Sequence, residues 1–200
     1  MKALLEKPAL YELFSRLVGA GHSRDAFVKT YVRPRAGDKV LDVGCGPADI
    51  LEHLPGVDYF GFDISPSYIE SATRRYGDRG RFYCERVSEA RAFAEREGTF
   101  DIVLAIGILH HLDRGEALDL FALARRALRA GGRLVTLDPC YVPGQSSIAR
   151  YLASRDRGRF VRSEEEYREL ARRDFPGVRS AVRHDLLRMP YTHIILECEK

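Results

Sequence analysis

The sequence predicts an α/β protein with a seven-stranded, mostly parallel sheet, helices on both faces and an antiparallel strand near the C-terminus. Between residues 39 and 137, short apolar segments alternate with amphipathic ones of roughly ten to fifteen residues, as in strands joined by crossover helices. The segment 101–106 is apolar after its first residue, which is typical of a strand buried on both faces. Too few residues separate the strand-like segments 178–186 and 192–199 for a crossover helix, so these two should pair antiparallel.

The first 35 residues predict two helices that form a cap, 1–35, beside the sheet. Pro8 suits a first helical turn, and Gly19 ends the helix that it opens. Ser23 can cap a second helix, which should end before Pro34.

The middle of the chain predicts five strands and four helices in alternation. A glycine pair, Gly131-Gly132, is expected to end the last of these helices, and Asp138 and Pro139 are expected to form the turn that leaves the fifth strand. The expected strands are 39–43, 59–63, 81–84, 101–106 and 133–137, and the expected helices are 50–54, 66–76, 88–97 and 118–130.

The composition indicates a globular protein with one domain, 1–200. A net charge of +3, from 32 basic and 29 acidic residues, is too balanced to indicate a nucleic-acid partner. The N-terminal segment lacks the pattern of a signal peptide, and the longest apolar run, 102–109, is too short to cross a membrane. We therefore expect a cytoplasmic monomer or homodimer. Four cysteines without metal-site spacing agree with a reducing compartment; they are Cys45, Cys84, Cys140 and Cys198.

The segment VLDVGCGPAD, residues 40–49, places a glycine-rich loop directly after the first strand. Glycines let a ligand approach the backbone, and a helix N-terminus behind them favours negative charge. Asp63 ends the next strand, where a carboxylate can accept hydrogen bonds from both ribose hydroxyls. Together these features predict an adenosine site for a dinucleotide or S-adenosylmethionine. Asp49 stands where a dinucleotide loop has its third glycine and would repel a pyrophosphate, which favours S-adenosylmethionine.

Three segments, VLDVGCGPAD, YFGFDIS and FDIVLAIGILHHLD, resemble motifs one, two and four of the class I S-adenosylmethionine-dependent methyltransferases. The resemblance covers about residues 38–138. It implies a Rossmann-like fold and transfer of a methyl group to an oxygen, nitrogen, sulfur or carbon atom of an acceptor. We expect the acceptor to be a small molecule, and we expect no nucleic-acid or membrane partner. A nicotinamide-dependent oxidoreductase and a non-catalytic S-adenosylmethionine-binding module are the alternatives.

The resemblance also implies roles for residues at the ends of four strands. Those after the first strand would hold the methionine part of the cofactor, those after the second its ribose and adenine, those after the third the adenine edge, and those ending the fourth would lie beneath the methionine. In that order they are Asp42, Gly44, Cys45 and Gly46; Asp63 and Ile64; Glu85, Arg86 and Val87; and Ala105 and Ile106. The Cys45 thiol is expected to fill space and not to act as a nucleophile, because a reactive thiol needs an electropositive site.

His110 follows the fourth strand and would stand at the mouth of the pocket. A neutral imidazole suits removal of a proton from a hydroxyl or amine at pH 7, so His110 is the candidate general base. Alternatively, it only hydrogen-bonds the loop backbone. His111 beside it could suggest a metal, but no carboxylate or thiol shares the spacing, so no metal site is expected. Asp113 is expected to cap the next helix.

Residues 139–175 are expected to form a lid over the substrate. The segment between Tyr141 and Arg162 interleaves aromatic side chains with arginines, a combination that could hold an anionic or aromatic substrate. A solvated surface helix with salt-bridged arginines is the alternative. Ser163 and Glu166 predict a capping box for the helix that follows. The residues expected to contact the substrate are Tyr11, His110, Tyr141, Arg150 and Arg155.

Overall fold

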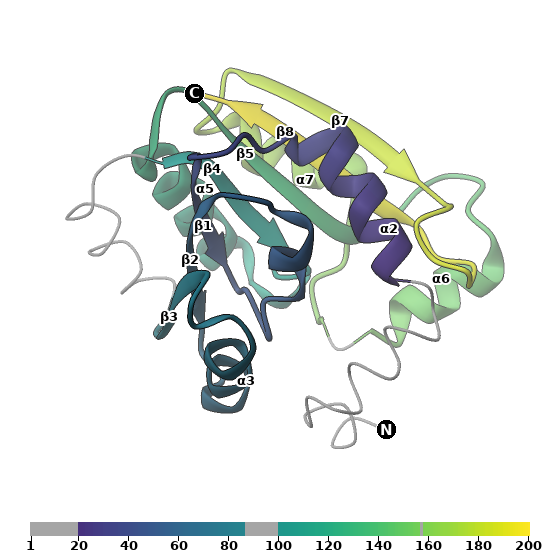
Figure 1. Cartoon of the computed structure of the whole chain (residues 1–200). Helices are drawn as coiled ribbons and strands as arrows, with labels where there is room; N and C mark the ends of the chain where they lie inside the picture. The colour runs from purple at the N-terminus through teal and green to yellow at the C-terminus, as the bar shows by residue number, and fades with distance from the viewer. Residues whose placement is uncertain (1–19, 87–99, 157) are drawn as a thin grey trace.

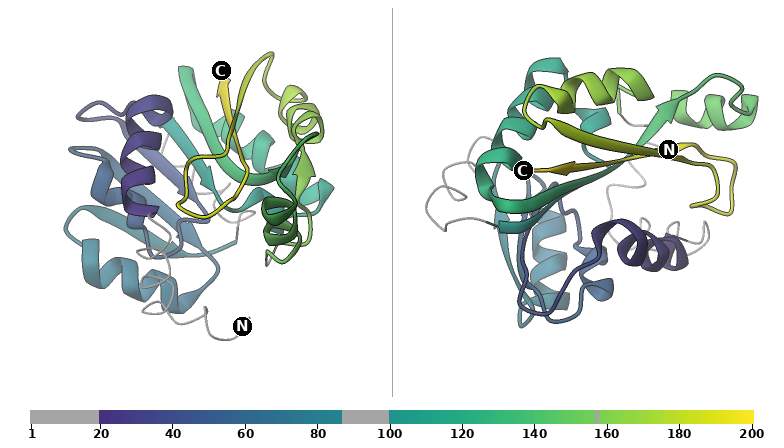
Figure 2. Two further views of the ribbon diagram at one scale, coloured as in Figure 1. Left: turned by 90° about the vertical axis from the view of Figure 1, so that its right-hand side faces the viewer. Right: turned by 90° about the horizontal axis from the view of Figure 1, so that it is seen from above.

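The computed structural model describes residues 20–86, 100–156 and 158–200 of the chain. Within these residues, an eight-stranded sheet carries helices on its two faces (Figures 1 and 2). Some of the predictions fall outside the described residues, namely the first helix of the N-terminal cap, the helix 88–97, Tyr11 and Val87.

Seven strands form the main path of the sheet in the order β3-β2-β1-β4-β5-β8-β7. Strand β8 runs antiparallel to both of its neighbours, whereas the other pairs along the path are parallel. A two-residue strand, β6, pairs with the end of β5. The predicted seven-stranded, mostly parallel sheet with one reversed strand is thus confirmed. The strands are β1 (Lys39–Val43), β2 (Asp58–Asp63), β3 (Gly80–Cys84), β4 (Phe100–Ile106), β5 (Leu128–Tyr141), β6 (Arg162–Ser163), β7 (Gly177–Arg183) and β8 (His193–Glu199).

Two apolar clusters lie on opposite faces of the sheet, because successive side chains of a strand point to opposite sides. Leu41 of β1 belongs to the first cluster and Val40 to the second. The first cluster joins the sheet to α5 and α7, and the second joins it to α2, η2, η3 and α3. The helices are α2 (Ala20–Phe27), η2 (Val28–Val32), η3 (Asp49–His53), α3 (Pro66–Tyr76), η4 (Leu109–His111), α5 (Arg114–Ala127), α6 (Ser147–Ser154) and α7 (Glu164–Arg172).

Two helices begin with the residues that the sequence predicts as caps. The side chain of Asp113 accepts a hydrogen bond from the backbone N–H of Glu116 at the start of α5, and the Glu116 side chain accepts one in return. Ser163 and Glu166 form the same reciprocal pair at the start of α7. Both caps satisfy N–H groups that the first helical turn leaves without a partner.

The sequence predicts a helix around residues 50–54. The structure corrects this prediction, because the segment forms only a short 3-10 helix, η3. Ala48 before it adopts a left-handed conformation with φ of 58°, and Pro55 follows directly after Leu54. A residue before proline is disfavoured in the α-region, so the chain has room for only one or two turns. No full helix dipole therefore stands behind the glycine loop.

Strand β5 begins earlier than predicted, at Leu128, which pairs with Phe100 of β4. The predicted helix before it accordingly ends at Ala127, and the Gly131-Gly132 pair lies inside the strand, next to a register shift. A Cβ built on Gly132 would lie 3.0 Å from the carbonyl oxygen of Phe100. The glycines thus permit a bulge in the strand and do not end the helix.

Strand β5 also continues further than predicted, to Tyr141. Asp138 and Pro139, which were expected to form a turn, pair with Ile194 and His193 of β8. The reversed strand β8 offers a full-length partner along this side of β5, and this pairing keeps Asp138 within the sheet. The side chain of Asp138 is almost fully buried as a result.

The chain runs from β1 outward to β2 and β3, and then crosses to β4 on the other side of β1. The loops after β1 and β4 therefore leave neighbouring strand ends in opposite directions. In open α/β sheets, ligands bind at this point, at the carboxyl ends of the strands. None of the helices in the described part of the chain is both long and apolar enough to span a bilayer.

Candidate functional site

The loops after β1 and β4 pack directly against each other. Gly44 has a φ of 77°, and a Cβ built on it would lie 2.5 Å from Cδ1 of Ile108. Any larger residue would both strain this backbone and push the β4 loop away. Gly44 therefore fixes the distance between the two loops that frame the candidate site.

The N–H groups of the glycine loop bind the protein itself. Those of Gly44 and Cys45 both donate to the carbonyl oxygen of Phe62, at 2.7 and 2.9 Å. That of Gly46 donates to Oδ2 of Asp63 at 2.9 Å. In the structure, these three N–H groups are therefore not free donors for the carboxylate of a ligand. They tie the loop to β2 instead.

Asp42 lies at the end of β1 beneath this loop, and it is 2% exposed. Its Oδ2 accepts a hydrogen bond of 2.5 Å from the Tyr59 hydroxyl, while its Oδ1 is buried and has no partner among the residues that the structure describes. Burial raises the pKa of Asp42 to about 7, the Tyr59 hydrogen bond lowers it, and the charge of Asp63 adds to the rise. A cationic ligand group at Oδ1 would relieve this unfavourable burial.

Asp63 connects the ends of β1 and β2. Its Oδ1 accepts a hydrogen bond of 2.8 Å from the N–H of Ser65, in addition to the bond from Gly46. It thus caps the turn before α3, and its partly exposed carboxylate retains lone pairs for a further donor. Ile64, beside it, is 73% exposed, an unusual position for a large apolar side chain.

The predicted adenine-edge residues lie after β3. The N–H of Glu85 donates to the carbonyl oxygen of Asp63 at 3.1 Å, which places Glu85 at the same end of the sheet, and Arg86 next to it is exposed. At the end of β4, Ala105 is fully buried and Ile106 partly so, and the following N–H of Gly107 donates to the carbonyl oxygen of Leu137.

The Cys45 thiol packs against β2, where a Cβ on Gly61 would lie 2.9 Å from its sulfur. Burial, followed by the charges of Asp42 and Asp63, raises the pKa of this thiol well above its usual value. A thiol in such surroundings stays protonated and unreactive. These contacts agree with the space-filling role that the sequence suggests.

Asp49 at the start of η3 is 8% exposed and lies between two arginines. Arg75 of α3 approaches it at 2.7 Å and Arg24 of α2 at 3.3 Å. The arginines compensate its charge, so Asp49 would repel a pyrophosphate less than the sequence argument assumed. The residue joins three helical segments below the loop.

The residues present fit S-adenosylmethionine. A Cβ built on Gly46 would have no atom of the described residues within 4 Å, so the loop faces open space within this part of the structure. Among the described residues, the buried Oδ1 of Asp42 has no hydrogen-bond donor, and the ammonium group of the cofactor could serve as that donor. The exposed Ile64 offers an apolar surface for the adenine. Asp63 would accept the ribose hydroxyls, as the sequence predicts.

His110 lies in η4, directly after β4, and is 5% exposed. Its Nδ1 is 2.7 Å from Oδ1 of Asp138, which also accepts the backbone N–H of His110 at 3.1 Å. Asp138 comes from β5, 28 residues further along the chain. The sequence singled out Asp138 only as a turn residue, because nothing local showed that β5 would carry it beneath His110.

The second ring nitrogen of His110 also faces a carboxylate. Its Nε2 is 3.2 Å from Oδ1 of Asp156, which follows α6. Burial lowers the pKa of His110, but the hydrogen bonds to Asp138 and Asp156 outweigh burial and raise the pKa to about 9. The expected neutral imidazole is thus not what this arrangement favours, because both ring nitrogens are engaged by carboxylates.

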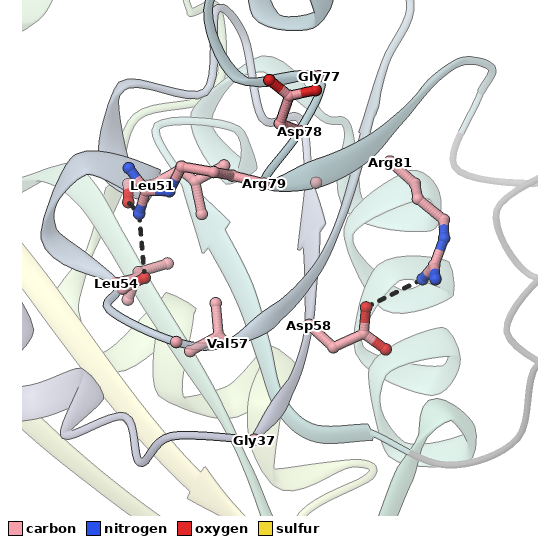
Figure 3. A pocket seen from close by; sticks show the side chains of 11 residues that line it. Gly37, Leu51, Leu54, Val57, Asp58, Gly77, Asp78, Arg79 and Arg81 are labelled. Carbon is pink, nitrogen blue, oxygen red and sulfur yellow. Dashed lines mark hydrogen bonds and ion pairs between the residues drawn. The ribbon is translucent and has the colours of Figure 1, made fainter.

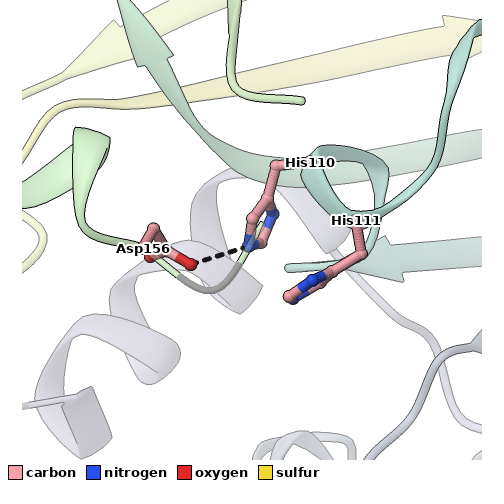
Figure 4. Close-up of side chains that lie close together, drawn as sticks. All are labelled: His110, His111 and Asp156. Carbon is pink, nitrogen blue, oxygen red and sulfur yellow. Dashed lines mark ion pairs between the residues drawn. The ribbon is translucent and has the colours of Figure 1, made fainter. Parts of the chain in front are cut away.

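Figure 4 shows His110 and His111 side by side on one turn, with Asp156 reaching towards His110 from the segment after α6. One nitrogen or oxygen atom from each of the three lies within 4.8 Å of the others, a spacing that could hold a metal ion. The sequence missed this carboxylate, because Asp156 is far from the histidines in the chain. Its direct pairing with His110 accounts for its position without an ion.

The predicted substrate residues are only partly brought together. Tyr141, Arg150 and Tyr151 line a surface cavity of about 490 Å³, with the guanidinium of Arg150 5.1 Å from the centre of the Tyr141 ring. Arg155 stacks on Tyr151 instead, at 5.4 Å. The end of the predicted lid 139–175 belongs to the core, because the helix α7 packs against the sheet.

Another cavity, of about 520 Å³, lies elsewhere (Figure 3). It is lined by residues at the amino ends of β2 and β3, including Asp58 and Arg81, which form an ion pair at 2.9 Å. Arg79 closes one side by donating to the carbonyl oxygens of Leu51 and Leu54. The cavity is therefore at the opposite end of the strands from Asp42, Asp63 and His110.

Comparisons with known proteins agree with the sequence motifs. Residues 41–134 match a family model described as a methyltransferase domain. The 27-O-demethylrifamycin SV methyltransferase of Amycolatopsis mediterranei is 34% identical over 123 residues, covering 57% of this chain and 43% of that protein. The O-methyltransferase cnsE of Penicillium expansum is 31% identical over 158 residues, covering 73% and 54%. A TehB-like SAM-dependent methyltransferase from Corynebacterium glutamicum has a TM-score of 0.64 at 18% identity, covering 95% and 96%.

The chain spans about half the length of the two curated relatives. The likeness to the solved structure shows the fold alone, because the identity is low. The matched residues 41–134 include the loops after β1 and β4 together with Asp63. This similarity favours S-adenosylmethionine over a dinucleotide as the ligand of the site.

Proposed function

This chain carries a class I S-adenosylmethionine-dependent methyltransferase domain, and from that premise we propose that it methylates a hydroxyl oxygen of a small, anionic molecule. The observation that carries the proposal is the pairing of His110 with Asp138. His110 lies after β4, in the loop that packs against the glycine loop. Nitrogen, sulfur and carbon acceptors are less well supported, since a hydroxyl is the group that most needs a base. Two relatives named as acting on oxygen support the same choice.

S-adenosylmethionine, when bound, supplies a methyl group that its sulfonium charge has already activated. The protein needs to hold the reactants in line, and such positioning can account for most of a rate enhancement. Asp42 would pair with the ammonium group, Asp63 would accept the ribose hydroxyls, and Ile64 would lie against the adenine. Gly46 leaves the space that the cofactor needs in front of the loop.

His110 would take the proton of the acceptor hydroxyl on Nε2. Asp138 holds Nδ1 at 2.7 Å, so it orients the ring and stabilises the imidazolium that forms. Asp138 is almost fully buried and keeps its place in β5 through the pairing with β8. This division of labour makes His110 the catalytic residue and Asp138 the residue that positions it.

The acceptor would bring its anionic group to Arg150. This guanidinium lies over the Tyr141 ring in the cavity beside α6, where a carboxylate or sulfonate could pair with it while an aromatic ring packs on Tyr141. Arg155, on the next turn, would contribute long-range attraction. Tyr11 remains a proposed contact from the N-terminal cap.

We further propose a cytoplasmic monomer or homodimer that binds neither nucleic acid nor membrane. The four cysteines are all free thiols, which agrees with a reducing compartment. Size-exclusion chromatography with light scattering would give the oligomeric state.

Calorimetric titration with S-adenosylhomocysteine and with NAD tests the cofactor, and only the first is expected to bind. Radiolabelled donor is then incubated with phenolic carboxylates and with their methyl ethers, in which the hydroxyl is blocked. Label should enter the free phenols alone. Binding of NAD alone, or label transfer to protein or RNA without transfer to any small molecule, would contradict the proposal.

A further inference from the structure

Asp156 is the point at which the segment after α6 contacts His110. Its Oδ1 lies 3.2 Å from Nε2 of His110 and accepts the N–H of Gly158 at 3.3 Å, and its Oδ2 accepts a hydrogen bond of 2.5 Å from the Tyr191 hydroxyl. Burial raises the pKa of Asp156, but the bonds from His110 and Tyr191 outweigh it and lower the pKa below the usual range. The carboxylate is thus ionised and held by three donors, from His110, Gly158 and Tyr191.

The residues that follow, 158–162, form a covering segment over the His110 turn. The N–H of Phe160 donates to the carbonyl oxygen of His110 at 3.0 Å, and the guanidinium of Arg162 donates to those of Leu109 and Leu112 at 2.8 and 2.7 Å. A Cβ built on Gly158 would overlap the His110 ring. The backbone of the covering segment therefore packs directly on the His110 ring, with no room for a side chain at Gly158.

Both ring nitrogens of His110 are consequently occupied, so an acceptor hydroxyl must displace one carboxylate to reach the base. Asp138 cannot yield easily, because it lies within a paired strand and its side chain has no exposed surface. The Asp156 side chain is 28% exposed and stands on a connection between helices and strands. Nε2 is therefore the ring nitrogen from which the acceptor can displace a carboxylate.

The other titratable groups around His110 do not replace Asp156. His193 of β8 is buried, and burial lowers its pKa to about 4, so it is neutral there. Tyr191 precedes β8, and burial raises its pKa above its usual range. The ring of His111 lies beside that of His110, with 4.1 Å between centroids and a tilt of 39°. The charged partners of His110 in the described structure are thus Asp138 from β5 and Asp156 from the segment after α6.

We propose that Asp156 occupies, at Nε2 of His110, the place that the acceptor hydroxyl takes during the reaction, and that it is a positioning residue which keeps His110 protonated until the substrate displaces it. This inference rests on the proposed role of His110 as the base. Release of Asp156 removes one of the two carboxylates that favour the imidazolium. The pKa of His110 then falls towards its ordinary value, and Nε2 releases its proton to solvent as Asp156 leaves. The neutral imidazole can then accept the proton of the acceptor hydroxyl at neutral pH.

The first test needs neither cofactor nor substrate, so its failure is distinguishable from failure of the proposed reaction. The ring protons of His110 are titrated by NMR in the free protein, with the signal assigned by its loss in His110→Gln. The apparent pKa should be near 9 in the wild type, and Asp156→Asn should lower it by about one unit or more. Gly158→Ala, which pushes the covering segment away by another route, should shift it in the same direction.

Tyr191→Phe is the matched control, because it removes a hydrogen bond from Asp156 and leaves the carboxylate in place. Its shift should be smaller than that of Asp156→Asn. With donor and an accepted substrate, the acidic limb of kcat/KM, which reports the free enzyme, should move to lower pH in Asp156→Asn. The limb of kcat, which reports the complex, should move little.

An unchanged His110 titration in folded Asp156→Asn and Gly158→Ala would overturn the proposal. A fall of kcat at every pH in Asp156→Asn would also do so, since Asp156 would then act in the transition state. Stoichiometric binding of Zn²⁺ that is lost in both His111→Gln and Asp156→Asn would overturn it in favour of a metal site at the same three residues.

Discussion

The Tyr59 hydroxyl donates a hydrogen bond of 2.5 Å to Oδ2 of Asp42, across the neighbouring strands β2 and β1. Both residues are almost fully buried beneath the glycine loop, and Oδ1 of Asp42 has no partner among the described residues. An ionised carboxylate with half of its hydrogen bonds unmade is costly in such a place. The protein without cofactor therefore carries a strained charge where the cofactor would supply an ammonium group.

Asp42→Asn should make the cofactor-free protein more stable relative to the wild type at pH 8 than at pH 5. The pKa of Asp42 is raised in the folded state to about 7, above its ordinary value of 3.8. Its contribution to stability is thus fully present below about pH 4 and is lost as the pH rises through about 7. The difference in the free energy of unfolding, measured with urea, should change by at most about 4 kcal/mol over this range.

The exposed Asp78, after α3, gives a matched control, because Asp78→Asn removes a carboxylate that the fold does not bury. The difference between wild type and Asp78→Asn should not vary with pH in the same window. If the difference in the free energy of unfolding between wild type and Asp42→Asn is also independent of pH, Asp42 does not carry the strained charge.

Gly46→Ala should weaken binding of S-adenosylhomocysteine by about tenfold or more, through a methyl group in the space that the cofactor needs. Gly46 has a φ of 55°, so alanine there also costs roughly 1–2 kcal/mol of stability. Calorimetry gives the affinity, and thermal unfolding gives the stability. Both should fall together in this variant.

Gly37→Ala separates the two effects. Gly37 also has a positive φ, 87°, and open space around its Cβ position, but it precedes β1 at the other end of the strand. This variant should lose similar stability and keep its affinity. An affinity loss of equal size in both variants would point to general destabilisation and away from a cofactor contact at Gly46.

Local patterns were sufficient to predict much of the fold, and they are also the basis of the proposed cofactor residues. Asp63, Asp113 and Ser163 each accept a backbone N–H from a residue two or three positions further along the chain. Such short-range chemistry can be read from a single sequence. Local predictions failed at the helix 50–54, where the effect of Pro55 was overlooked, and at Gly131-Gly132 and Asp138-Pro139, which lie inside β5.

The substrate half could not be predicted in the same way, because its contacts join distant segments. Asp138 reaches His110 only because β5 continues past Leu137, and that depends on the pairing with β8 near the end of the chain. Asp156 reaches His110 because Gly158 and Phe160 hold the covering segment down. No periodicity in the sequence reports contacts of this kind.

Asp63→Ala should weaken binding of S-adenosylhomocysteine by about 1–3 kcal/mol, because it removes the acceptor proposed for the ribose hydroxyls. It also removes the acceptor of the Gly46 and Ser65 N–H groups, so some loop order should be lost. The comparison of S-adenosylhomocysteine with its 2′-deoxy analogue isolates the ribose contact. Wild type should discriminate between these ligands and Asp63→Ala should not. Equal discrimination in both proteins would remove Asp63 from the ribose site.

Arg150→Ala should raise the KM for an anionic acceptor by about two- to fivefold and leave kcat nearly unchanged. The guanidinium is solvent-exposed beside Tyr141, so its pairing with an anion is screened and worth only about 0.4–1 kcal/mol. Arg150→Lys should lose less, because it keeps the charge. Steady-state kinetics with a phenolic carboxylate and its neutral amide measure the charge-dependent part, which should vanish in Arg150→Ala.

Arg172 supplies the matched control for Arg150. It is also a partly exposed helical arginine, but it pairs with Glu165 on α7 at 2.7 Å. Removal of this charge changes the net charge of the protein by the same amount without touching the cavity at Tyr141. Arg172→Ala should leave the KM for both acceptors as in the wild type. If the two arginine variants raise the KM equally, the effect is long-range attraction, and the acceptor does not bind at Arg150.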